Sequence, residues 1–125
     1  MNVGDATGTL FTWESNNFSM KETRMKGASL SKWPAAVMIS GLVEDGTMAY
    51  DDPVNKYLSW WSKNETDPRS RVTLRHLLSF TSGYTKDQAP LLCEESFQEC
   101  TQKQYEKSTH YVEPGTTWTY LGCHL

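Results

Sequence analysis

The strongest hydrophobic pattern in the chain covers residues 34–45 and predicts an amphipathic helix. Apolar residues recur at three- and four-residue spacings that place them on one helix face: Ala35, Met38, Ile39, Leu42 and Val43. Gly46 follows, and glycine at this point commonly ends a helix. Because Pro34 disfavours helical backbone at Trp33, we expect an irregular or 3₁₀ start, which still aligns positions i and i+3.

Shorter helices are predicted by residues that favour helix starts. Asp52 is a good N-cap and Pro53 a good first helical residue, so a short helix is expected from there through Tyr57. Residues 59–72 are mostly polar and are interrupted by Pro68, which predicts a loop.

Two more helices are expected further along the chain. Thr73 is predicted to cap a helix that runs from Leu74 to about Phe80 and ends at Ser82–Gly83. A helix from Glu94 to Lys107 has an acidic first turn and lysines in its last turns, which suits the helix dipole.

Strand signals are few. Residues 8–13 predict a short strand, followed by a hairpin turn at 14–17 and a second strand near 18–22. Residues 116–120 alternate like a strand or an extended segment after the Pro114–Gly115 turn. Because an isolated hairpin is marginal in water, we expect the sheet to continue beyond residue 125 and the chain to be a fragment.

Composition excludes several function classes. The 125 residues make one domain at most, and 12% aromatic residues argue against disorder. The net charge of −3 argues against a nucleic-acid partner. The chain contains neither an apolar run long enough for a membrane span nor a signal peptide at its start.

One dense site of candidate chemistry precedes the 34–45 helix. Ser29 and Lys32 are three residues apart, which places both side chains on one face of a helical turn. A serine hydroxyl needs a base to become a nucleophile, and a neighbouring lysine can be that base. Backbone N–H groups at the helix start favour a developing oxyanion. By spacing alone, the better interpretation is a solvated serine cap beside a surface lysine.

Several motifs in one order carry a family resemblance. They are Ala28–Lys32, Leu42–Gly46, Asp51–Leu58, Val72–Gly83, and Pro114–Thr116 followed by Tyr120. Together they resemble the serine β-lactamase-related family, which includes class C β-lactamases, D-alanyl-D-alanine carboxypeptidases and related esterases. The resemblance implies an α+β fold, a partial β-lactamase/transpeptidase-like architecture with helices packed on an incomplete antiparallel sheet. Residues 1–125 would then form a single incomplete domain.

The resemblance also implies roles. Ser29 matches the acylated nucleophile, Lys32 the lysine that activates it, and Tyr120 a tyrosine that shares proton transfer. The family's Tyr-x-Asn block has Gly122 at its asparagine position here, and no later Lys-x-Gly or His-x-Gly motif occurs in the sequence. The implied function is a serine hydrolase of amides or esters that forms an acyl-serine intermediate, inactive as this chain.

The alternative is a non-catalytic fragment or binding module that keeps the helical part of the fold. The implied substrate is a small-molecule or peptide amide or ester, with no metal and no cofactor.

For other candidate residues a structural explanation is preferred. His76 is expected to be structural rather than a base, Trp60–Trp61 to pack rather than stack on a ligand, and Asp51–Asp52 to form a cap and turn rather than bind a metal. The arginines at 69, 71 and 75 are expected to be solvated rather than to form an anion site. His110 and His124 lack a partner at metal-binding spacing.

Cysteines and glycosylation sequons bear on the compartment. Cys93 and Cys100 would lie about 10 Å apart if both were helical, beyond the ~7 Å that a disulfide allows. They can pair only if Cys93 lies in the loop before the helix. With the sequons at Asn17 and Asn64 and the family's usual setting, this pairing predicts a secreted or lumenal protein.

Overall fold

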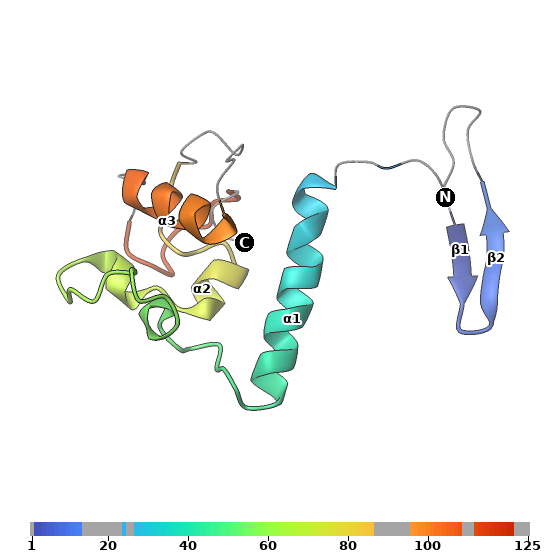
Figure 1. Cartoon of the computed structure of the whole chain (residues 1–125), viewed down its shortest axis with the longest axis horizontal. Helices are drawn as coiled ribbons and strands as arrows, with labels where there is room; N and C mark the ends of the chain where they lie inside the picture. Colours follow the sequence, from blue (N-terminus) through green and yellow to red (C-terminus); the bar gives the residue numbers. More distant parts are fainter. Residues whose placement is uncertain (1, 14–23, 25–26, 87–95, 109–111, 122–125) are drawn as a thin grey trace.

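The computed structural model describes residues 2–13, 24, 27–86, 96–108 and 112–121. Its strands and helices are β1 (Asn2–Asp5), β2 (Gly8–Thr12), α1 (Lys32–Glu44), α2 (Leu74–Leu78) and α3 (Phe97–Lys107). Three 3₁₀ turns accompany them: η1 (Ala28–Ser31), η2 (Val54–Lys56) and η3 (Pro68–Arg71). Figure 1 shows α2, α3 and their loops gathered on one side of α1, with the hairpin on the other side. The α+β class is as expected.

The two strands form an antiparallel hairpin in which Asn2 pairs with Thr12 and Asp5 with Gly8. The turn is closed by Asp5, whose carboxylate accepts hydrogen bonds from the backbone N–H and the hydroxyl of Thr7. The strand predicted at 8–13 is therefore present. Its partner is the preceding segment, which the sequence analysis did not predict; the turn and strand expected at 14–22 lie outside the described residues.

Helix α1 agrees with the predicted helix at 34–45, although it begins two residues earlier at Lys32. A 3₁₀ turn precedes it as expected, but Trp33 is itself helical although Pro34 follows it in the first turn. Gly46 follows the helix with φ +78°, the left-handed conformation that glycine adopts readily. No α1 residue is buried, so its apolar residues have only partial cover.

The short helix expected at 52–57 is a 3₁₀ turn that begins at Val54, and the predicted cap is wrong by one residue. Pro53, in extended backbone, is the N-cap. The reason is that the Asp52 carboxylate is used elsewhere: it accepts from the Ala49 N–H and from Lys56 Nζ, each at 2.8 Å, and from the Tyr57 hydroxyl.

The predicted loop at 59–72 contains a further 3₁₀ turn. Pro68 begins this turn rather than breaking the chain, because proline lacks only an N–H that a first helical residue does not use. The Asp67 side chain caps the turn by accepting from the Arg69 N–H.

Thr73 caps α2 as predicted, and His76 completes the capping box. The Thr73 hydroxyl accepts from the His76 N–H, while His76 Nδ1 accepts from the Thr73 N–H at 3.2 Å. The structural interpretation of His76 is thus supported. The helix ends at Leu78, two residues before the expected end, because Phe80 adopts a left-handed backbone with φ +60°.

Helix α3 ends at Lys107 as predicted but begins at Phe97 rather than at residue 94. Ser96 is its N-cap, and Ser96 and Glu99 form a capping box. The extended backbone of Ser96 fixes the helix start there. A sequence pattern defines such boundaries only loosely, because several polar residues near 94–96 can cap a helix.

The core lies between the 54–84 segment and α3. Val54, Trp61, Val72 and Tyr84 are its buried residues. The Trp61 ring lies 4.6 Å from that of Tyr105, and its Nε1 donates to the Arg69 carbonyl at 2.7 Å. Each large apolar side chain buried here contributes about 1.5–3 kcal/mol. The packing interpretation of the tryptophan pair is confirmed.

The remaining charged candidates form ion pairs. Arg69 pairs with Asp67, Arg71 with Glu113, and Arg75 with Asp51. The expectation that these arginines are only solvated is therefore wrong, because each forms an ion pair. In the part of the chain that the structure describes, no helix has the length and apolarity to cross a membrane.

Candidate active site

The first feature of the site is the contact between Ser29 and Lys32. Lys32 Nζ donates to Ser29 Oγ at 3.4 Å, at the long end of hydrogen-bond distances. Ser29 lies in η1 and is exposed, whereas Lys32 begins α1 and is half-buried. The predicted proximity of the two groups at the start of the helix is therefore present.

The backbone around Ser29 is unusual for its residues. Ala28 has φ +44°, a conformation that costs a non-glycine residue about 1–3 kcal/mol and that clusters at functional sites. The neighbouring Ser31 hydroxyl donates to the Ala28 carbonyl at 2.9 Å and is thereby occupied locally. Of the two serines in this turn, Ser29 is the one that contacts the lysine.

Tyr120 joins the pair from the other end of the chain. Lys32 Nζ lies 5.2 Å from the centroid of the Tyr120 ring, within the range of a cation–π contact. Lys32 thus contacts both Ser29 and Tyr120, and the three residues predicted for the site come together.

The segment that carries Tyr120 is held by the loop after α2. Three backbone bonds join the two: the N–H of Val112 donates to Gly83, that of Gly115 to Thr81, and that of Thr119 to Phe80, at 2.7–2.9 Å. Residues 116–120 form no regular strand or helix, and residue 116 lies in a bend. The contact between Lys32 and Tyr120 therefore depends on the 80–83 loop.

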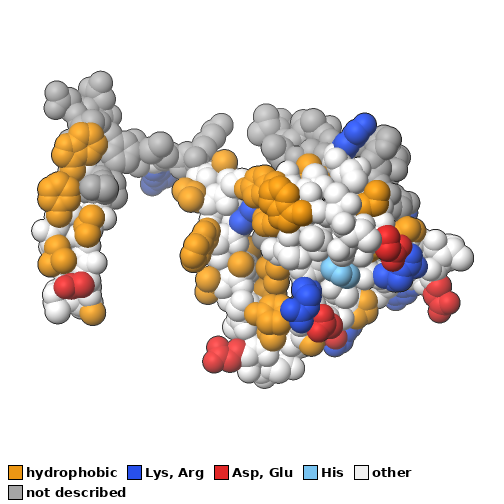
Figure 2. Space-filling model, turned by 180° about the vertical axis from the view of Figure 1, so that it is seen from behind, with side chains coloured by type: hydrophobic (Ala, Val, Ile, Leu, Met, Phe, Trp, Pro, Cys, Tyr) orange, Lys and Arg blue, Asp and Glu red, His pale blue; other side chains and the backbone are white. Residues whose placement is uncertain are grey.

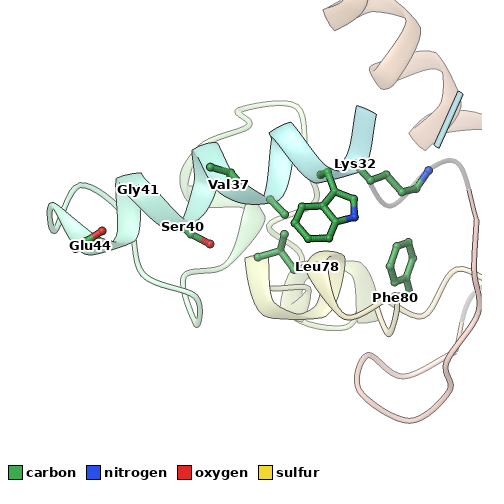
Figure 3. Close-up of a pocket in the computed structure, with 9 residues that line it drawn as sticks. Lys32, Val37, Ser40, Gly41, Glu44, Leu78 and Phe80 are labelled. Carbon is green, nitrogen blue, oxygen red and sulfur yellow. The ribbon is translucent and has the colours of Figure 1, made fainter. Parts of the chain in front are cut away.

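An apolar groove of about 570 Å³ runs along α1 beside the cluster. Figure 3 shows Lys32 and Phe80 at one end of it, Glu44 at the other, and Val37 and Leu78 between them. In Figure 2, hydrophobic side chains are exposed along α1 and along the hairpin.

Two features of the site lie beyond sequence reasoning. Phe80 stacks on Tyr120 with ring centroids 4.9 Å apart, and Trp118 lies 6.3 Å from Phe80. No sequence signal indicates a left-handed phenylalanine, so Phe80 could not have been found from the pattern.

Gly122 lies outside the described residues. Among the residues that are described, no cluster could hold a metal ion.

Comparisons with known proteins identify the family of this chain. A sequence model of the family described as Beta-lactamase matches residues 13–123. A crystal structure described as a "putative beta-lactamase" from Bacteroides dorei DSM 17855 is similar, with a TM-score of 0.72 and 27% identity. The similarity covers 94% of this chain and 34% of that one, so the chain spans about a third of the other protein's length. No curated protein matches the sequence.

The family match covers the Ser29–Lys32 turn, the α2 region and Tyr120, and the structural match extends over nearly the whole chain. The chain belongs to the Beta-lactamase family.

Proposed function

We propose that this chain carries the nucleophile and proton-transfer groups of a serine hydrolase that cleaves an amide or ester through an acyl-serine intermediate. The observation that carries the proposal is the position of Lys32, whose amine contacts Ser29 Oγ on one side and the Tyr120 ring on the other. Family membership supports it.

In the proposed reaction, Ser29 Oγ attacks the carbonyl carbon and its proton passes to the Lys32 amine, with Tyr120 sharing the transfer. The carbonyl oxygen becomes an oxyanion, and the start of the helix stabilises it. When the carbon–nitrogen or carbon–oxygen bond breaks, the leaving group takes the proton. Water then adds to the acyl-serine and releases the acid.

Turnover by these residues alone is proposed to be absent. Gly122 stands where the family motif has an asparagine that orients substrate, and the 125 residues contain no Lys-x-Gly or His-x-Gly motif. The substrate class is a small-molecule or peptide amide or ester.

The competing hypothesis is a non-catalytic fragment or binding module, and Gly122 is the observation that favours it. It predicts that Ser29 has no greater reactivity than other exposed serines.

We propose further that the protein works outside the cytoplasm. The Asn64 sequon lies in an exposed loop, where an oligosaccharide can be attached.

The test is covalent labelling by a fluorophosphonate probe, followed by peptide mapping. The nucleophile hypothesis predicts labelling at Ser29, its loss in Ser29→Ala, and a fall of about 10²-fold or more in Lys32→Met, since general base catalysis contributes 10²–10⁴-fold. Ser31→Ala is the matched control, because that hydroxyl lies in the same turn but donates to Ala28. Equal labelling of Ser29 and Ser31 would instead support the non-catalytic module.

A further inference from the structure

The described residues include two non-glycine residues with a left-handed backbone, and both border the site. Ala28, with φ +44°, directly precedes Ser29. Phe80, with φ +60°, lies at the end of α2, far from Ser29 in the sequence, and stacks on Tyr120. A bulky residue with this backbone is a rare outlier, and such strain persists only where the surrounding structure holds it.

The backbone of Phe80 fixes the chain that carries Tyr120. Its carbonyl accepts from the Thr119 N–H at 2.9 Å. Thr119 directly precedes Tyr120, so this bond fixes the position of the backbone from which the Tyr120 side chain extends. The left-handed turn also ends α2, which frees the Phe80 carbonyl for this bond.

The ring of Phe80 fixes the orientation of Tyr120. The two centroids are 4.9 Å apart with planes inclined at 35°, and Trp118 contacts both rings at 6.3 and 6.4 Å. Tyr120 remains 49% exposed, so little else encloses it in the described structure. Phe80 supports one side of the ring, and the Lys32 amine lies over it.

We propose that Phe80 is a positioning residue for the Ser29–Lys32–Tyr120 cluster, holding the Tyr120 ring under the Lys32 amine through its side chain and its carbonyl. Phe80 itself does not react; it acts through Tyr120. The inference rests on the proposed function for its effect on reactivity, while its geometric part can be tested separately.

The geometric test is the NMR chemical shift of the Lys32 side-chain methylene next to the amine, measured in the 125-residue chain labelled with ¹³C-lysine at low concentration. A ring under the amine shifts this signal upfield, and Tyr120→Leu assigns the effect. Phe80→Leu should move the signal most of the way to its random-coil position, and Phe80→Tyr should restore it. Phe97→Leu is the matched control, because Phe97 is 87% exposed on α3.

The reactivity test is the rate of fluorophosphonate labelling at Ser29 in the same variants. Misplacing a reacting group by about an ångström can lower a rate ~10²-fold. Phe80→Leu is therefore expected to lower the labelling rate about 10- to 100-fold, and Phe80→Tyr to restore most of that rate. Phe80→Gly separates the ring from the backbone, because glycine keeps the left-handed turn and therefore the fold. Phe80→Gly should lower the labelling rate as much as Phe80→Leu does.

The outcomes are distinct. Wild-type rates in both Phe80→Leu and Phe80→Gly would overturn the proposal, as would an unchanged Lys32 signal in those variants. A change in the Lys32 NMR signal without a change in the labelling rate at Ser29 would also overturn it, because Phe80 would then order the Tyr120 ring without serving the reaction. A wild-type chain that shows the upfield shift but no labelling at Ser29 would refute the proposed function and leave the geometric inference standing.

Discussion

Gly83 and Val112 approach each other so closely that a β-carbon on Gly83 would lie 2.2 Å from the Val112 carbonyl oxygen. The Val112 N–H donates to the Gly83 carbonyl at 2.7 Å, and Gly83 has φ +96°. Gly83 therefore permits the first of the backbone bonds that tie the segment bearing Tyr120 to the loop after α2.

Gly83→Ala should destabilise the chain by at least about 3 kcal/mol, because it adds a steric clash to the cost of a left-handed alanine. Gly46→Ala is the matched control: Gly46 also has positive φ, +78°, but a β-carbon there meets nothing within 4 Å. The control should lose only about 1–2 kcal/mol. Urea unfolding followed by tryptophan fluorescence measures both, and equal losses would contradict the assigned clash.

Turnover is expected to be absent in the 125-residue chain. Steady-state hydrolysis of a chromogenic cephalosporin or a p-nitrophenyl ester should be no faster than in Ser29→Ala, because Gly122 and the missing third motif leave the substrate poorly oriented. Release of one equivalent of product by acylation would agree with this expectation. Sustained turnover that depends on Ser29 would refute it.

Acid should weaken the turn at Asp52. Hydrogen bonds from Lys56, then Tyr57 and the Ala49 N–H, lower the pKa of Asp52 from 3.8 to about 2. When folding lowers the pKa of a carboxyl group, that group stabilises the fold at pH values above its unfolded-state pKa. This stabilisation disappears as the pH falls through the folded-state pKa. Stability should therefore decline between about pH 4 and pH 2.

Asp52→Asn should flatten this part of the pH profile while lowering stability near pH 6. Tyr57→Phe, which keeps the Lys56 ion pair, should flatten it less. Urea midpoints at intervals of half a pH unit measure the difference, and a parent-like acid profile in Asp52→Asn would exclude Asp52 as the source.

The disulfide between Cys93 and Cys100 stays a prediction, because Cys93 lies outside the described residues. Cys100 lies on α3 and is disulfide-bonded in the structure. Alkylation without reductant, followed by mass spectrometry, should leave both cysteines unmodified and yield a linked peptide. Cys123→Ser should leave that peptide unchanged, whereas free thiols at 93 and 100 in folded protein would rule out the pairing.

Exposed apolar side chains on α1 should make the isolated chain prone to association. Trp33, Val37 and Met38 are 76%, 63% and 68% exposed. Each large apolar side chain left in water forfeits about 1.5–3 kcal/mol, and a few such losses rival the ~5–15 kcal/mol stability of a domain. Strong binding of a dye that fluoresces on apolar surfaces is therefore expected.

Replacing Val37 and Met38 by glutamate should reduce dye binding and association together. Phe97→Glu, which removes a single exposed ring on α3, should change them little. A sharp, cooperative thermal transition of the monomeric chain without dye binding would show that the exposed face carries no such penalty.

Local rules accounted for much of the helical structure. The helix at residues 32–44, its 3₁₀ start, the Thr73 cap and the contact between Ser29 and Lys32 each depend on residues within about one turn of one another. The sequence could therefore predict them from spacing. The error at Asp52 arose because its carboxylate binds three other nearby groups instead of capping the turn. The error at the end of α2 arose because Phe80 adopts a left-handed backbone.

Strand pairing was harder to predict from the sequence. The Asp5 turn that joins β1 to β2 is local, yet every residue of the hairpin is exposed, so no burial pattern identified its first strand. The pairing is set by turn geometry, which a pattern of apolar residues does not report.

Tertiary structure alone decided how the site is assembled. The spacing of residues in the sequence could not bring Tyr120 to Lys32; only the family resemblance pointed to it, and the Phe80 turn and the Gly83 contact hold it there. Trp61 likewise reaches Tyr105 only through the packing of α3. Contacts within one helical turn follow from the backbone geometry of a few residues, whereas contacts between distant segments depend on how the whole chain packs, because many residues jointly offset the entropy of closing the loops between them.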